Sequence, residues 1–287
     1  GDRPAGGRAD DGGPVQAAAL LRDPLNPAIH VGGLNARLGD ALGISSFGAR
    51  DIGAYELIDD ANLIVTSLED GINAADGVVT LREAVLAANA REGADTITFA
   101  ENGQGVIRLT EGELVITDEL TVQGGGAVTI TGDANGDDIL QDAATYGNAA
   151  VTNARASYSA QDSGATAQNL DDNSRIFSTT ADLTLAGLTL TGGSSGFDGT
   201  FSSGGAVQAT GDAALTVRDS LIAGNIQAGY GRSGGGLYTE TGALSVYDSA
   251  IAGNVAWRDG AAGAGLASNG GEIMLSGTTV TNNAIGR

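Results

Sequence analysis

The sequence has no cysteine and no lysine, and it has one histidine and few aromatic residues. Without cysteine the chain can form no disulfide and no thiolate metal site. The single histidine, His30, lies outside the repeated part of the sequence, so no Ser–His–Asp catalytic set is predicted. All 14 basic residues are arginine, and 35 acidic residues bring the formal net charge to −21. This balance argues against binding to nucleic acid or to anionic membranes.

Long apolar runs are also absent: no stretch of about 18 apolar residues occurs, so no membrane insertion is predicted. The chain begins with Gly1 rather than methionine, and no signal peptide opens it. We therefore expect a piece of a longer product, either processed or one unit of an array. The acidic composition favours an extracellular protein, and one that binds divalent cations.

A repeat is what the sequence does have. Segments beginning at Leu215, Leu244 and Ile273 align without gaps, 29 residues apart, and a looser copy begins at Leu183. Each full copy reads apolar-x-apolar-x-x-small-x-apolar-x-x-Asn. The alternation predicts strands with one buried face, and the two-residue break between them predicts a bend.

A second motif recurs with about the same spacing and predicts a third strand in each repeat. It consists of small residues, mostly glycine, followed by Val207, Leu237 or Leu266. Three short strands in about 29 residues predict an all-β fold, a right-handed parallel β-helix (solenoid) in which each repeat stacks on the one before. The alternative, a β-sandwich with coincidental spacing, would show hairpin turns and no fixed period.

Stacking would align equivalent residues. Asn225, Asn254 and Asn283 are then predicted to form a structural ladder, in which each amide bonds the amides above and below.

The first 57 residues lack the repeat. They contain Asp-Asp-Gly-Gly-Pro ending at Pro14, Asn-Pro-Ala-Ile-His ending at His30, and Asp-Ile-Gly-Ala-Tyr-Glu ending at Glu56. In this order the pieces resemble the terminal segment of bacterial extracellular right-handed β-helix proteins of the pectate-lyase-like superfamily, with a choice-of-anchor-like end. The resemblance implies that residues 1–57 are an end-piece that closes a β-helix unit, which a neighbouring copy would supply. His30 stands where the pattern has an acid.

A new start follows an acidic joint at 58–62. Residues 63–95 are expected to hold a strand and a helix over 80–90, with Thr80 and Glu83 as a capping box and Leu81, Val85 and Leu86 as its apolar face. Val79 to Ala84 is similar to the CSLREA opening of the same group, which implies a cap on the first rung of the β-helix. Residues 96–287 are predicted to form the β-helix, interrupted by a long loop at 132–173.

The sequence stops soon after Asn283 without a cap. We expect the last rung to be an assembly interface made by Ile273, Leu275, Val280 and Asn283, because uncovered strand edges pair readily. The expected partner is another copy, joined head to tail by its first 57 residues, or an adjacent repeat of a longer chain.

Two candidate ligand sites remain. Asp133, Asn135, Asp137 and Asp138 alternate like the oxygen ligands of a calcium loop, which makes calcium the expected cofactor, although no glycine and no distal glutamate stand at the usual positions of such loops. Four aromatic residues fall near predicted turns, where we expect them to pack against a loop; the alternative is an exposed surface on which sugars would stack: Tyr230, Tyr238, Tyr247 and Trp257.

Catalysis is not the prediction, and no catalytic residue is assigned. Asp219 and Asp248 occupy equivalent positions one rung apart, with Arg218 and Tyr247 beside them, as a carboxylate pair would. Gly277 breaks the row in the third copy. The function predicted is therefore a structural or adhesive β-helix module of a bacterial cell surface. A polysaccharide lyase or glycoside hydrolase and a threefold phage or toxin appendage are the alternatives.

Overall fold

A computed structural model of the chain describes residues 63–73, 75–136, 173–195, 203–229, 234–257 and 262–286. The chain separates into two compact units, Gly1–Leu57 and Ile58–Arg287, and all described residues belong to the second. The predicted end-piece, the joint at 58–62 and most of the predicted long loop (137–172) lie outside the described residues.

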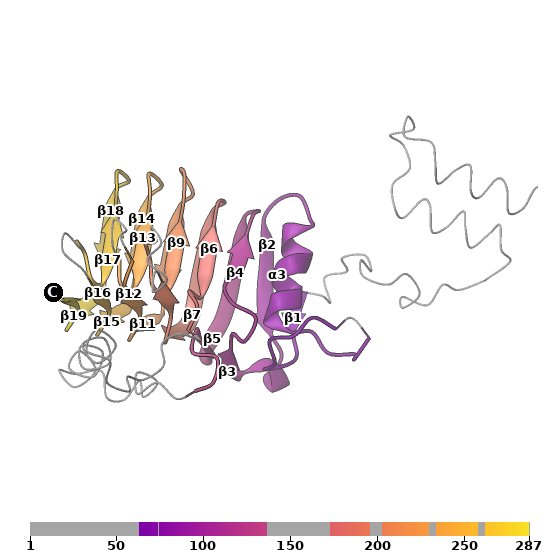
Figure 1. Ribbon diagram of the computed structural model, residues 1–287. Helices are drawn as coiled ribbons and strands as arrows, with labels where there is room; N and C mark the ends of the chain where they lie inside the picture. Colours follow the sequence, from indigo (N-terminus) through magenta and orange to yellow (C-terminus); the bar gives the residue numbers. More distant parts are fainter. Residues whose placement is uncertain are drawn as a thin grey trace, which may run out of the picture. The chain divides into compact units, whose positions relative to one another are not determined.

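The described part is built mainly of parallel β-strands in three sheets (Figure 1). The largest sheet has eleven strands: β1 (Ile64–Val65), β2 (Asp95–Phe99), β3 (Gly105–Arg108), β5 (Leu120–Thr131), β7 (Leu183–Thr191), β10 (Leu215–Arg218), β11 (Leu221–Ala223), β14 (Leu244–Tyr247), β15 (Ala250–Ala252), β18 (Ile273–Ser276) and β19 (Thr279–Thr281). The five-stranded sheet holds β4 (Leu114–Ile116), β6 (Phe177–Thr179), β9 (Val207–Ala209), β13 (Leu237–Thr239) and β17 (Leu266–Ser268). The four-stranded sheet holds β8 (Ser194–Ser195), β12 (Ile226–Gln227), β16 (Val255–Trp257) and β20 (Ala284–Gly286).

The chain contributes strands to the three sheets in turn, and each set of strands pairs with the set before it. We call one such pass a rung; the last one comprises β17, β18, β19 and β20. Leu215 pairs with Leu244, which pairs with Ile273, so successive rungs are in the register given by the 29-residue repeat. The parallel β architecture predicted from the repeat is confirmed at this level.

Two details of the strands differ from the prediction. A fourth strand follows the asparagine of each repeat, as in β12 and β16, where the pattern predicted three strands. Predicted strands at 120–122 and 128–130 form one strand, β5, whose register against β7 shifts between Gln123 and Val128. The glycines between these residues allow the irregularity.

Each rung bends in the eleven-stranded sheet at a residue with positive φ. In four consecutive rungs this position holds Gly187, Asp219, Asp248 and Gly277, with φ of 61°, 53°, 45° and 61°. Glycine adopts this conformation without steric cost, and aspartate is among the few other residues that tolerate it. The bend therefore explains the residue types found there.

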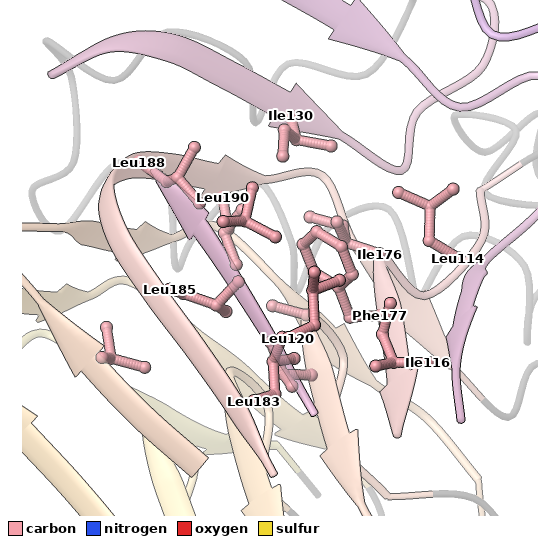
Figure 2. Close-up of a cluster of buried hydrophobic side chains, with 14 of the residues drawn as sticks. Leu114, Ile116, Leu120, Ile130, Ile176, Phe177, Leu183, Leu185, Leu188 and Leu190 are labelled. Carbon is pink, nitrogen blue, oxygen red and sulfur yellow. The ribbon is translucent and has the colours of Figure 1, made fainter. Parts of the chain in front are cut away.

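The core is a column of aliphatic side chains enclosed by the three sheets. Figure 2 shows Phe177 among Leu120, Ile116 and Ile176, residues from neighbouring rungs that are all at most 1% exposed. Alternate residues of a strand point inward, so a short strand such as β10 contributes only two side chains, Leu215 and Val217, to this core. Burial of each contributes about 1.5–3 kcal/mol, and stability must accumulate rung by rung.

The first rung is covered by α3 (Leu81–Asn89), which contacts β1, β2 and β4. The predicted capping box is confirmed: the Glu83 backbone N–H donates to Thr80, and the Thr80 backbone N–H donates to the Glu83 carboxylate. The buried face differs from the prediction. Leu86 is 43% exposed, and Ala84 and Ala88 join Leu81 and Val85 against the strands, as a spacing of three and four residues requires.

A buried carboxylate fixes the segment before α3. The Asp70 side chain accepts two hydrogen bonds from the Arg82 guanidinium, at 2.9 Å each, and bonds from the backbone N–H groups of Thr110 and Glu111. Asp70 thereby ties α3 to the turn before β4.

Farther along, the half-buried Arg175 guanidinium pairs with Glu113 and donates to the Gly204 carbonyl. Burial lowers the pKa of the Arg175 guanidinium, and the neighbouring Glu113 carboxylate opposes that shift. The described residues also include the short 3₁₀ helix η2 (Glu101–Gly103). Neither it nor α3 has the length and apolar character needed to cross a membrane.

Candidate functional site

The three repeat asparagines lie in one column at the bend between the eleven-stranded and four-stranded sheets. Asn225 Nδ2 donates to Asn254 Oδ1, and Asn254 Nδ2 donates to Asn283 Oδ1, both at 2.9 Å. Asn225 and Asn254 are fully buried, whereas Asn283 in the last rung is half-buried. Their remaining amide hydrogens bond strand carbonyls, such as that of Ile222 for Asn254.

This column has a direction. Each Oδ1 accepts from the rung before it: Gly193 N–H donates to Asn225, Asn225 N–H to Asn254, and Asn254 N–H to Asn283. The backbone N–H of Asn283 is the next donor in the series. Among the described residues it has no acceptor.

Glycines of the second motif make room for the amides. A Cβ atom added to Gly265 would lie 2.9 Å from Asn283 Cγ, and one added to Gly236 would lie 3.2 Å from Asn254 Cγ and 2.5 Å from the Gly265 carbonyl oxygen. The small residues before β13 and β17 therefore serve the amide column as well as the turn.

The inward side chains of the last rung are exposed where their equivalents are buried. Ile273, Leu275 and Val280 are 41%, 44% and 46% exposed. Leu244, Val246 and Ile251, which pair with them in the preceding rung, are completely buried. These three residues and Asn283 were the predicted assembly interface, and we refer to their surface as the open edge.

The open edge and the opposite end of the stack differ. No strand of the described ranges pairs with the outer side of β17, β18, β19 or β20. At the other end α3 packs on the first strands through its buried face.

The candidate carboxylate pair is brought to one cavity. Asp219 and Asp248 line a hollow of 420 Å³ together with Ser220, Ser249 and Gly277. Arg218 Nη1 lies 3.6 Å from Asp219 Oδ2 at the surface. Both aspartates occupy the positive-φ bend, which supplies a structural reason for them that requires no substrate.

The predicted calcium loop is only partly described, because Asp137 and Asp138 lie outside the described residues. Asp133 is completely buried; its Oδ1 accepts from the Gly136 N–H at 2.7 Å, and its Oδ2 has no hydrogen-bond partner among the residues that the structure describes. No group of three or more His, Cys, Asp or Glu side chains able to hold a metal occurs within the described ranges. Calcium binding here stays a prediction.

The four aromatic residues do not share one exposed face. Tyr238 is 4% exposed in β13, and the Tyr247 hydroxyl lies 3.2 Å from Met274 Sδ of the next rung. Tyr230 and the Trp257 side chain lie outside the described residues. Packing within and between rungs accounts for the two that are described.

Two features of the site escaped the sequence reasoning. The residues at the position of the repeat that holds a small side chain in every full copy form a second hydrogen-bonded column. In it the Ser220 N–H donates to Ser249 Oγ and the Leu188 N–H donates to Ser220 Oγ. Its signal was present, because the position is Ser, Ser and Thr in successive copies. The role of Asp70 had no sequence signal, since its partners lie up to 41 residues away.

Comparison with models of protein families, with curated proteins and with solved structures finds no match to this chain.

Proposed function

We propose that this protein is a structural module: a right-handed parallel β-helix of the bacterial cell surface that assembles head to tail into a rod or filament. The observation that carries the proposal is the contrast between the two ends of the described stack. One end is closed by α3, while the other presents Ile273, Leu275 and Val280 in the register that a further rung would cover.

Energetics support stacking at the open edge. Covering the three apolar side chains would contribute about 1 kcal/mol for each. Parallel pairing along β18 would add backbone hydrogen bonds, of which each contributes about 0.5–1.5 kcal/mol net. Uncovered edges of this kind pair readily with another chain.

Residues 1–57 of a second copy are the proposed occupant. They form a unit of their own, and their length is close to twice the 29-residue repeat. They also resemble the closing segment of bacterial β-helix proteins. A contact between two different surfaces repeats from copy to copy, so it propagates as a filament rather than closing as a dimer.

The extracellular location rests on composition and resemblance: a net charge of −21, no cysteine, and the end-piece and cap motifs. In this setting the stacked rungs act as a stiff spacer. We favour this role over glycan cleavage because backbone geometry already accounts for Asp219 and Asp248.

Sedimentation velocity of the 287-residue chain over a concentration series tests the proposal. We expect large species at high concentration. Val280→Asp, which places a charge in the inward column, should reduce association by at least tenfold. Thr279→Asp is the matched control. Thr279 is next to Val280 in sequence but its side chain points outward, and Ala250, which pairs with it in the preceding rung, is only half-buried.

A wild-type chain that stays monomeric throughout the series contradicts the proposal and favours the other occupant, an adjacent repeat of a longer chain. Equal association of Val280→Asp and Thr279→Asp contradicts the assignment of the open edge. The melting temperature of each dilute variant checks that the substitutions leave the fold intact.

A further inference from the structure

Three Asn-Gly dipeptides occur in the sequence, and the structure describes all of them: Asn102–Gly103, Asn135–Gly136 and Asn269–Gly270. This pairing is chemically reactive, because the backbone nitrogen of a glycine can approach the side-chain amide of the residue before it with little steric hindrance. All three asparagines are exposed to solvent. Exposure therefore does not distinguish the three dipeptides, whereas the state of each glycine nitrogen does.

The glycine nitrogen of the first dipeptide is held in η2. The Gly103 N–H donates to the Ala100 carbonyl at 2.9 Å, and Asn102 Nδ2 donates to the Thr66 carbonyl at 2.7 Å. Gly103 is also packed closely, since a Cβ atom added to it would collide with the Val65 carbonyl oxygen. Both groups that would have to react with each other are thus fixed by other partners.

The glycine nitrogen of the second dipeptide is bound to a buried side chain. The Gly136 N–H donates to Asp133 Oδ1 at 2.7 Å, and Asp133 is completely buried. A length of 2.7 Å is at the short end of the range for N–H···O hydrogen bonds. This bond would have to open before the Gly136 nitrogen could attack Asn135.

The glycine nitrogen of the third dipeptide lies in the turn between β17 and β18 and has no such partner. Among the described residues the Gly270 N–H reaches only Ser268 Oγ, at 3.4 Å, which is longer than a usual N–H···O bond. Ser268 Oγ is closer to the Gly271 N–H, at 2.9 Å. The Asn269 side chain has no hydrogen-bond partner among the residues that the structure describes.

The open environment of Gly270 belongs to the turn and does not come from the uncovered last rung. Thr241 holds the equivalent position in the preceding rung, which has neighbours on both sides, and it is exposed as well. Backbone donors in this turn point to the rung before: the Thr241 N–H donates to the Gly211 carbonyl, and the Asn269 N–H donates to the Thr239 carbonyl. A further rung after β17 would therefore not supply the acceptor that the Gly270 N–H lacks.

We propose that Asn269 is a site of spontaneous deamidation, in which the Gly270 backbone nitrogen is the nucleophile and water is the only co-reactant. The nitrogen attacks Asn269 Cγ, and the new N–Cγ bond closes a five-membered cyclic imide. The Cγ–Nδ2 bond breaks and releases ammonia, which carries away the proton of the Gly270 N–H. Water then opens the imide: opening at Cγ leaves an aspartate at position 269, and opening at the backbone carbonyl leaves an isoaspartate.

The reaction changes the turn in two ways. Either product adds a negative charge beside Glu240, whose backbone carbonyl accepts from the Asn269 N–H and whose carboxylate accepts from the Gly211 N–H. The isoaspartate also adds one carbon atom to the backbone between β17 and β18, although the pairing of both strands with the preceding rung fixes their register. We therefore expect the modified turn to pair less tightly with the rung before it.

Peptide mapping of the folded 287-residue chain after incubation at mildly alkaline pH tests the proposal. The chain has no lysine, so trypsin cuts only after arginine and releases the three dipeptides on three different peptides. Mass spectrometry should find deamidation at Asn269 about tenfold faster or more than at Asn102 and Asn135, the factor that one well-made hydrogen bond imposes when it must first open. Equal rates at the three sites, or no reaction at Asn269, overturn the proposal.

The same incubation in concentrated guanidinium chloride is the control for sequence context. No glycine nitrogen is held in the unfolded chain, so the three rates should become similar. If Asn269 keeps the same lead over Asn102 and Asn135 in the unfolded chain, the folded turn does not select it, and the proposal is wrong.

Gly270→Ala tests the assignment of the nucleophile. The atom nearest to a Cβ atom added at Gly270 is Thr241 Cγ2, at 3.6 Å, and the φ of Gly270 is not positive, so alanine fits the turn. The variant should keep the melting temperature of the wild type. Deamidation at Asn269 should slow by about tenfold or more, because the added methyl group hinders the approach of the nitrogen. An unchanged rate in Gly270→Ala would contradict attack by that nitrogen.

Discussion

A buried asparagine at each bend makes hydrogen bonds that a leucine of similar size cannot make. Asn254 exchanges side-chain bonds with both neighbouring rungs and donates to the Ile222 carbonyl. Replacing Asn254 by leucine removes the acceptor of the buried Asn225 N–H and one donor to the Ile222 carbonyl. We expect Asn254→Leu to lower the free energy of unfolding by about 2–4 kcal/mol in urea titrations.

Asn283→Leu is the comparison for that measurement, because Asn283 is half-buried and has one neighbouring rung instead of two. Its loss should be about half as large. Equal losses at the two positions would mean that the buried column contributes no more than the edge.

Asp219 and Asp248 illustrate how a bend constrains residue type. A non-glycine residue in the left-handed region costs roughly 1–2 kcal/mol, although aspartate tolerates it better than most. The two carboxylates also lie one rung apart with like charge. We therefore expect Asp219→Gly to raise the melting temperature, by the few degrees that about 1 kcal/mol produces.

Asp212→Gly serves as the control for the bend, since Asp212 is exposed and its φ is not positive. That substitution should be neutral or destabilising, because glycine gains more freedom in the unfolded chain. A melting temperature that falls with Asp219→Gly would show that the carboxylate has a stabilising role beyond the turn.

At the scale of elements, α3 depends on a contact made far from it in sequence. Asp70 is completely buried as a side chain and holds Arg82 on α3 together with the Thr110 and Glu111 N–H groups. Removing one partner of a buried ion pair leaves an uncompensated charge and costs about 3–5 kcal/mol. Asp70→Ala should lower the free energy of unfolding by about that amount, measured by urea unfolding.

Glu92→Ala removes the same charge at an exposed residue just beyond α3 and should change stability by less than about 0.5 kcal/mol. If the two variants behave alike, the anchoring role of Asp70 is wrong.

The strands could be predicted from sequence where the signal repeats. Alternation of apolar residues over Leu215 to Ile222 and its copies gave the strands, and the fixed spacing gave the parallel register. The strand after each asparagine was missed because Ile226–Gln227 is too short for alternation to be visible. The prediction of the buried face of α3 was also wrong at Leu86. Adjacent helical residues point 100° apart, and Ala84 and Ala88, which are buried instead, carry little apolar signal.

The site was predictable to a similar depth. Matching asparagines in successive repeats predicted a column, but its direction depends on which way each side-chain amide is turned. The pattern of residue types carries no information on that orientation. The calcium prediction depended on spacing alone, and half of its residues lie outside the described ranges.

At the largest scale, the two ends of the described stack of rungs differ. The described stack is closed by α3 at its first rung and open along β17, β18, β19 and β20 at its last (Figure 1). The open edge combines three half-exposed apolar side chains with the donors of Asn283. In the head-to-tail assembly that we propose, these features would favour growth in one direction, by addition of one copy at a time.

Electron microscopy of the purified 287-residue chain tests that account most directly. We expect unbranched rods, one molecule wide and many copies long, which shorten when Val280→Asp is mixed with the wild type. Discrete particles of a single copy, at concentrations where the edge should be occupied, would contradict it.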